Sequence, residues 1–74
     1  MGRARYAFRV RGSTSDEVLA ALREEMEVEV EVDPDQTSTA IQGWLPDQAA
    51  LYGMLARIRL LGLELLEVRR LPSG

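Results

Sequence analysis

The sequence predicts an α+β fold in which two helices cover one face of an antiparallel sheet. Three observations support this prediction. Residues 5–11 and 27–32 alternate apolar with polar side chains, as half-buried strands do, and residues 37–45 are expected to form a third strand that pairs with the second. Residues 13–26 and 46–62 repeat apolar side chains every three or four positions, as amphipathic helices do. A further apolar segment after the second helix completes the order β-α-β-β-α-β.

The first strand, 5–11, separates aromatic and branched side chains from basic ones, and Gly12 ends it. Side chains at alternate positions of a strand point to opposite faces of the sheet. We expect the helix-covered face to carry Tyr6, Phe8 and Val10. The opposite face is then expected to carry Arg5, Ala7, Arg9 and Arg11.

The first helix, 13–26, begins in a run of hydroxyl residues. Thr14 and Glu17 fit a capping box, in which side chains of the first turn satisfy free backbone N–H groups. Apolar residues then recur on one side of the helix, and this side is expected to pack on the sheet. They are Val18, Leu19, Leu22 and Met26.

The second and third strands, 27–32 and 37–45, are predicted to form a hairpin. In the turn at 33–36, Pro34 presets its φ angle, and the side chain of Asp33 can accept a hydrogen bond from the backbone that follows. The residues expected beneath the helices are Val28, Val30, Val32, Ile41 and Leu45. The other face would carry Glu27, Glu29, Glu31, Ala40, Gln42 and Trp44.

The second helix, 46–62, is bounded by residues that suit helix ends. Pro46 and Asp47 open it, and Gly62 lies at the position just past its end. Its buried stripe is expected to be Leu51, Met54, Leu55, Ile58 and Leu61.

The last strand, 63–71, completes a ferredoxin-like α/β plait. Right-handed crossovers fold this order into a four-stranded antiparallel sheet, order 4-1-3-2, with both helices on one face. A chain of 74 residues has room for a single core. We therefore expect one domain over 1–74, with residues 1–4 and 72–74 as disordered tails.

The sheet face without helices is the candidate functional surface, because whatever lies on it meets solvent or a partner. Its arginines and glutamates belong to strands two places apart, about 9.6 Å, and could form ion pairs across Ala40 and Gln42. The glutamates could also discourage the addition of a foreign strand at their edge. A third interpretation is that both charges pair between two copies in a face-to-face homodimer.

Trp44 favours the homodimer, because aromatic residues and arginine are enriched in interfaces. Alternation breaks at Leu65 and Leu66, so one of these leucines lies outside the core unless the strand bulges. Leu63 and Leu65 would then join Trp44 and Ala7 in an apolar patch. An alternative is that Trp44 covers the start of the second helix. The predicted partner contacts are Arg9, Arg11, Glu29, Glu31, Gln42 and Trp44.

The composition argues against most catalytic functions. The chain has no cysteine, histidine or lysine, which leaves no disulfide and no conventional base to activate a nucleophile. The usual ligands of zinc, iron and copper are missing, so no metal and no cofactor are expected. Helix capping accounts for the hydroxyl residues at 13–15.

Other features argue against nucleic acid and membrane partners. The net charge is −3, and Tyr6 and Phe8 are expected to be buried, whereas RNA-binding plaits stack bases on their open sheet. No apolar run approaches the ~20 residues that span a bilayer, so we expect a cytoplasmic protein.

The segment LPDQAALYGMLARIRLLGLELLEVRR, 45–70, resembles the C-terminal half of short uncharacterised actinobacterial proteins. The matching pieces are Leu45 to Leu51, Gly53, and Leu61 to Arg70. This resemblance covers about a third of the chain and implies no activity. Arginine in place of lysine agrees with a GC-rich bacterial source.

The order and length of the elements are also similar to ACT-type regulatory domains, which pair as dimers and bind amino acids near the first strand–helix turn. This resemblance implies a site for an amino acid or phosphometabolite at Arg11, Gly12, Ser13, Thr14 and Ser15. The chain departs from that group because no clear polar ligand set lies beside Gly12, and a fold alone does not carry function.

We therefore expect a non-catalytic, self-associating protein–protein interaction domain that acts through the open face of its sheet. Its partner is expected to be a second copy, or else another protein. An ACT-like small-molecule sensor is the alternative, and RNA or DNA binding is a third possibility.

Overall fold

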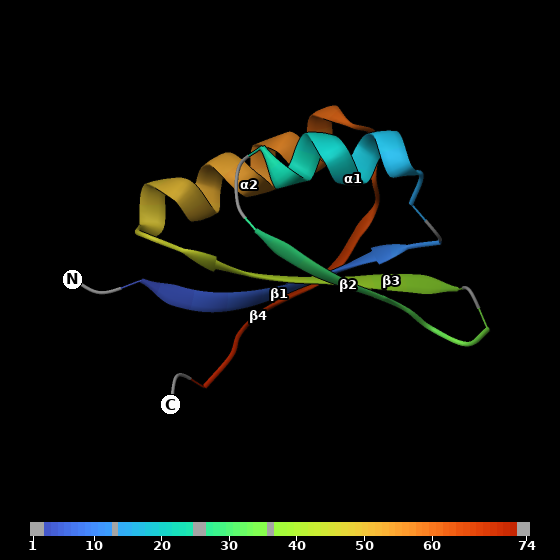
Figure 1. Cartoon of the computed structure of the whole chain (residues 1–74), viewed down its shortest axis with the longest axis horizontal. Helices are drawn as coiled ribbons and strands as arrows, with labels where there is room; N and C mark the ends of the chain where they lie inside the picture. The colour runs from blue at the N-terminus through green and yellow to red at the C-terminus, as the bar shows by residue number, and fades with distance from the viewer. Residues whose placement is uncertain (1–2, 13, 25–26, 36, 73–74) are drawn as a thin grey trace.

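A computed structural model describes residues 3–12, 14–24, 27–35 and 37–72 of the chain (Figure 1). The elements follow the predicted order β-α-β-β-α-β. Sheet and helices form two layers, with both helices on the same side of the sheet. The elements are β1 (Ala4–Arg11), α1 (Asp16–Arg23), β2 (Val28–Val32), β3 (Ser38–Leu45), α2 (Gln48–Leu60) and β4 (Leu65–Arg70).

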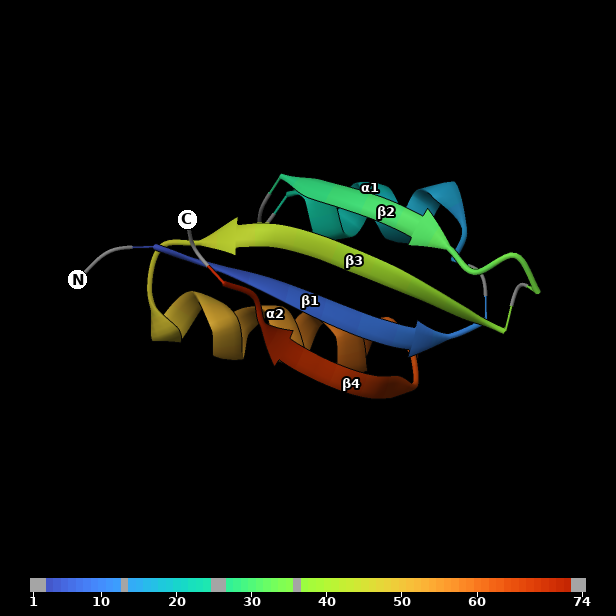
Figure 2. The same cartoon turned by 90° about the horizontal axis from the view of Figure 1, so that it is seen from below.

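The four strands lie in the order β2-β3-β1-β4, which confirms the prediction when the sheet is read from its other edge (Figure 2). Every neighbouring pair is antiparallel. Strands β1 and β3 are central, and Phe8 lies opposite Ile41 in their register. The strand that carries the arginines is therefore central and the strand that carries the glutamates is an edge, as expected.

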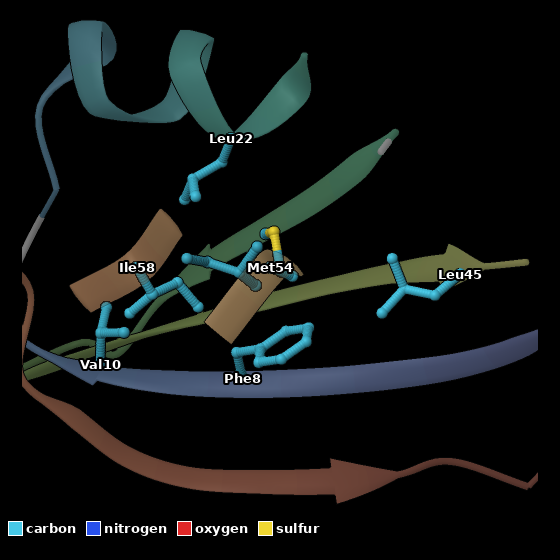
Figure 3. Close-up of a cluster of buried hydrophobic side chains, with 7 residues drawn as sticks. Phe8, Val10, Leu22, Leu45, Met54 and Ile58 are labelled. Carbon is cyan, nitrogen blue, oxygen red and sulfur yellow. The ribbon is translucent and has the colours of Figure 1, made fainter. Parts of the chain in front are cut away.

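The core lies between the central strands and the helices. Figure 3 shows side chains from β1, β3 and both helices converging there. None of the surface of Phe8 or Val10 is exposed, so the predicted phase of β1 is confirmed. The buried cluster consists of Phe8, Val10, Leu22, Ile41, Leu45, Met54 and Ile58.

Strand β2 is less buried than its alternation predicts. Val28 and Val30 are half-buried, but Val32 is 44% exposed, so its predicted burial is wrong. An edge strand has a neighbouring strand on one side only, and β2 has only β3 beside it. The last valine of this strand therefore lies at a corner of the sheet rather than in the core.

Helices α1 and α2 begin three and two residues later than predicted. Ser15, not Thr14, is the N-cap of α1, and its hydroxyl accepts a hydrogen bond from the N–H of Val18 at 3.3 Å. A capping box needs a Glu or Gln three positions after the N-cap. With Ser15 as the N-cap that position is Val18, so the predicted capping box of Thr14 and Glu17 does not form. In α2 the N-cap is Asp47, so the helix proper begins after it.

The end of α2 is as predicted, with Gly62 directly after the C-cap. Its φ is +79°, a conformation that favours glycine. The N–H of Leu63 bonds the carbonyl of Ile58 at 3.2 Å, and Leu63 packs against the core. The prediction that Leu63 joins Trp44 on the open face is therefore wrong.

Strand β4 contains the bulge that the leucine pair suggested. Its register with β1 shifts between Arg9, opposite Glu67, and Val10, opposite Leu65. Residues directly opposite in an antiparallel pair share a face, so Leu65 lies on the side of buried Val10. The predicted contribution of Leu65 to the open face is therefore wrong, and Leu66 is the extra residue of the bulge.

Strand β1 starts earlier than the sequence suggested. Ala4 belongs to the strand and is 8% exposed, whereas residues 1–4 are expected to form a tail. The described residues contain no helix that is long and apolar enough to cross a membrane. Outside the described residues lie positions 1–2, Ser13, 25–26 with the predicted stripe residue Met26, position 36 of the turn, and 73–74.

Candidate interaction surface on the open sheet

We call the side of the sheet that neither helix covers the open face (Figure 1). Residues paired across strands share a face, so the register assigns its members. Ala7 lies opposite Gln42, and Gln42 lies opposite Glu29. These three side chains therefore form a row on one face that runs from β1 across β3 to the edge strand β2. The open face comprises Arg5, Ala7, Arg9, Arg11, Glu29, Glu31, Ser38, Ala40, Gln42, Trp44, Glu67 and Arg69.

Arg5 forms the first part of an ion-pair lattice on the open face. Its Nη2 is 2.9 Å from Oε1 of Gln42 and 3.3 Å from Oε2 of Glu29. The predicted link between the arginine and glutamate strands is thus formed, and Gln42 takes part in it. Because the Glu29 side chain is 80% exposed, this ion pair adds at most about 1 kcal/mol to stability.

Arg9 forms the second part of the lattice, and its partners Asp33 and Ser38 were not predicted from the sequence. Its Nη1 donates to Oδ2 of Asp33 at 2.9 Å and to Oγ of Ser38 at 2.8 Å. The Ser38 hydroxyl also donates to Asp33, which closes the network. Glu67 completes the surroundings of Arg9, with its Oε1 3.9 Å from Nε. Ser38 is only 5% exposed despite its place on the open face, because this network surrounds it.

Asp33 takes the place of the expected carboxylate, Glu31. Arg9, Ala40 and Glu31 lie in one row, yet Glu31 has no ion pair in the described part of the chain. The N–H of Asp33 bonds the carbonyl of Ser38 at 3.0 Å, and this contact closes the β2–β3 hairpin. One feature of the sequence could have indicated this contact. Ser38, at an open-face position, follows the turn residue Asp33 by five residues.

Replacing Arg9 by methionine is expected to lower the free energy of unfolding by about 1 kcal/mol, because Asp33 and Ser38 lose their shared donor. The side chains of Arg9 and Asp33 remain 40% and 34% exposed, so solvent screening limits the loss. Arg11→Met is the matched control. Arg11 pairs with Glu64 at 3.1 Å, but these side chains are 64% and 60% exposed, so we expect a loss of about 0.3 kcal/mol or less.

Urea unfolding followed by circular dichroism measures both losses. If both methionine variants lose the same free energy of unfolding, the Arg9 network does not stabilise the fold more than the Arg11–Glu64 ion pair, and the prediction is wrong.

Trp44 is the largest side chain on the open face. Its pairing with Arg5 places it there, and 41% of its surface is exposed. The guanidinium carbon of Arg3 lies 4.7 Å from the centre of the indole ring, a cation–π arrangement. Arg3 was expected to lie in a disordered tail, so its contact with Trp44 was not predicted from the sequence.

A shallow hollow of about 150 Å³ lies beside Trp44, where the start of β2 meets the end of β3. Sites for drug-sized molecules enclose about 300–1,000 Å³. The hollow is therefore smaller than a site for a drug-sized molecule and has about the size of a single side chain. Its lining residues are Arg5, Glu27, Val28, Glu29, Gln42, Gly43 and Trp44.

The alternative ligand site begins at Gly12, whose backbone groups are both used within the chain. Its N–H donates to the carbonyl of Thr37 at 2.7 Å, and its carbonyl accepts from the hydroxyl of Thr39 at 2.6 Å. The φ of Gly12 is +77°, which favours glycine at this turn. Gly12 thus joins β1 to the start of β3.

Two of the remaining residues of this turn, Arg11 and Ser15, are also engaged. Arg11 pairs with Glu64, and the Ser15 hydroxyl caps α1. Thr14 has a buried hydroxyl without a hydrogen-bond partner, and Ser13 lies outside the described residues. In the described part of this turn, the buried hydroxyl of Thr14 is therefore the side-chain group left without a partner.

Acidic side chains are dispersed in the described residues, and nowhere among them do three or more gather in a way that could hold a metal ion. Asp35, in the β2–β3 turn, accepts hydrogen bonds from the backbone N–H of Thr37 at 3.1 Å and from its hydroxyl at 2.8 Å. These bonds favour the charged carboxylate and hold the pKa of Asp35 below its ordinary value. Their effect is to tighten the turn.

The fold and this surface define an α+β plait domain with one uncovered sheet face. The chain belongs to the family described as a domain of unknown function, DUF8691, whose family model matches residues 5–69. The match omits only the first residue of β1 and the last residue of β4 among the helices and strands. No curated protein and no solved structure matches the chain.

Proposed function

We propose that the chain is a non-catalytic protein–protein interaction domain that associates with a second copy of itself through the open face. The observation that carries this proposal is Trp44, an indole that is 41% exposed on a sheet face without helices. Tryptophan and arginine are enriched among the residues that contribute most to binding energy. Trp44 and the stacked Arg3 supply both at one point.

The surface around Trp44 can complement itself. A contact about a two-fold axis brings a patch of one copy against the same patch of the other. Trp44 forms part of the wall of the hollow, together with Arg5, Glu29 and Gln42. Each copy therefore offers an aromatic side chain and, next to it, a recess that can receive one.

The charges of the open face support such a contact without ion pairs between copies. Arg5 and Arg9 have carboxylate partners within the chain, so covering them does not leave a buried, unpaired charge. The sequence suggested that arginines of one copy pair with Glu29 and Glu31 of the other. With the internal pairs formed, these glutamates fit the polar rim of the contact better than its centre.

Trp44→Ala is expected to weaken self-association by at least about tenfold, because a central tryptophan contributes about 2 kcal/mol or more to binding. Sedimentation velocity from micromolar to millimolar concentration measures this change. Tyr52→Ala is the matched control, because Tyr52 is a 61% exposed aromatic residue of α2, away from the open face. A molar mass of one chain for the unmodified protein at every concentration would refute the proposal.

The intrinsic fluorescence of Trp44 gives an independent measurement, since it is the single tryptophan of the chain. If association covers the open face, the emission moves to shorter wavelength as the protein concentration rises. An association that leaves the emission unchanged does not involve this face.

Other functions have less support from the surface. RNA-binding plaits place aromatic residues of the central strands on the open sheet. Among the described residues of β1 and β3, Trp44 is the one aromatic residue on that face, because Phe8 is fully buried and Tyr6 packs against the core from the helix side. A single ring offers less than the two or three stacking positions of those domains. A small-molecule sensor would show a raised melting temperature with its ligand, so a thermal-shift panel of amino acids and phosphometabolites addresses that class.

A further inference from the structure

Strand β4 is the edge of the sheet opposite β2, and it carries both apolar side chains and charges of both signs (Figure 2). At the other edge, β2 presents Glu29 and Glu31, and charged side chains discourage the addition of a strand. Strand β4 instead leaves apolar side chains exposed along its length: Leu65 at 38%, Leu66 at 42% and Val68 at 37%. Exposed apolar side chains at an edge favour pairing with another strand, whereas the bulge at Leu66 and the charges of Glu67 and Arg69 restrict which strand can pair.

The backbone of β4 has hydrogen-bonding groups that β1 does not use. The N–H of Leu71 donates to the carbonyl of Arg5 at 2.8 Å, so the backbone groups of Leu71 point toward β1. Backbone groups along a strand point alternately to its two sides, hence those of Arg70 and Val68 point away from β1. In the described residues no strand lies on that side. Val68 and Arg70 can therefore bond an incoming strand.

The charged side chains of β4 determine which strand fits beside it. Glu67 lies opposite Arg9 and Arg69 lies opposite Ala7, so both are on the open face. They carry opposite charges and are separated only by Val68. An antiparallel strand with the same glutamate–valine–arginine order can match each charge with its opposite. Strand β4 of a second copy is such a strand.

We propose that two copies of the chain pair through β4 about a two-fold axis at Val68. In this register Glu67 of each copy lies opposite Arg69 of the other, and the two Val68 residues face each other on the helix side. Shifting the register by two residues sets Glu67 opposite Glu67, or Arg69 opposite Arg69, and like charges directly opposite destabilise a sheet. The charges thus select one register.

This contact goes beyond the proposed function and is independent of it. Trp44 belongs to β3, which β1 separates from β4, so pairing at the edge leaves the indole uncovered. The two sheets would join into one of eight strands, with both open faces on the same side. Each contact can therefore be present or absent without the other.

Two charge reversals in the full chain test the pairing. Both are made together with Trp44→Ala, which weakens the proposed open-face contact, and are compared with Trp44→Ala alone. Glu67→Arg and Arg69→Glu each set like charges opposite one another in a pair of identical copies. Each is expected to weaken self-association at least about tenfold. In an equimolar mixture all facing charges are opposite again, so sedimentation velocity should show the two-chain mass of the Trp44→Ala parent.

Control measurements separate this effect from a loss of fold. Glu17→Arg makes the same change of charge on α1, which lies on the β2 side of the molecule, and should leave association unchanged (Figure 2). Glu67 also lies 3.9 Å from Arg9, so circular dichroism must show that Glu67→Arg keeps its native spectrum. The proposal is wrong if the Trp44→Ala parent is a single chain at millimolar concentration, or if the mixture stays at one-chain mass.

Discussion

Phe8→Ala is expected to lower the free energy of unfolding by about 3–5 kcal/mol. None of the surface of Phe8 is exposed, and its ring lies in the middle of the core between the sheet and α2 (Figure 3). A domain of this length has a total stability of roughly 4–11 kcal/mol. The loss is therefore a large share of the total, and we expect a measurable unfolded fraction at 25 °C.

Tyr52→Ala provides the comparison for this loss. It also removes an aromatic ring, but Tyr52 is 61% exposed, so its loss is expected within about 0.5 kcal/mol of zero. Urea unfolding at several temperatures gives both values on one scale. Similar losses for the two variants would show that the core is not centred on Phe8.

The part of the fold that follows from local patterns could be predicted from the sequence. The alternation in β1 is a period of two residues, and it assigned Phe8 and Val10 to the helix side correctly. The order of the elements then determined the topology, because few connections of this order are compatible with right-handed crossovers. Gly62 was also recognised, because its φ of +79° is a local requirement.

What the sequence could not predict depends on contacts between distant residues. Arg9 reaches Asp33 because the hairpin closes beside Ser38, and an alternation pattern contains no such information. Arg3 reaches Trp44 because β1 begins at Ala4. The bulge in β4 was suggested by adjacent leucines, but its position, and so the side taken by Leu65, required the register with β1.

The two edges of the sheet explain why three glutamates alternate with valines in residues 27–32. Glu29 contacts Arg5, but Glu31 has no ion pair among the described residues. Its charge is best explained by its place at an exposed edge, where carboxylates oppose pairing. Under the β4 proposal, one edge of the sheet is closed to other strands and the other is open to a second copy.

Leu22→Ala is expected to lower the free energy of unfolding by about 2–5 kcal/mol and to loosen α1 in particular. The helix spans only Asp16–Arg23, and isolated helices shorter than about 12–15 residues are barely stable in water. Its stability must therefore come from packing. Leu22 is the fully buried residue of α1 and lies in the core cluster.

Leu60→Ala is the same chemical change at a site that is 84% exposed, so it should cost less than about 0.5 kcal/mol. Amide hydrogen exchange distinguishes local from global loss. We expect the amides of α1 in Leu22→Ala to exchange faster than those of β1 and β3, because the strands retain Phe8 and Ile41 as packing partners. Loss of protection in α1 and the strands to the same extent would contradict this, and would mean that α1 and the sheet unfold only together.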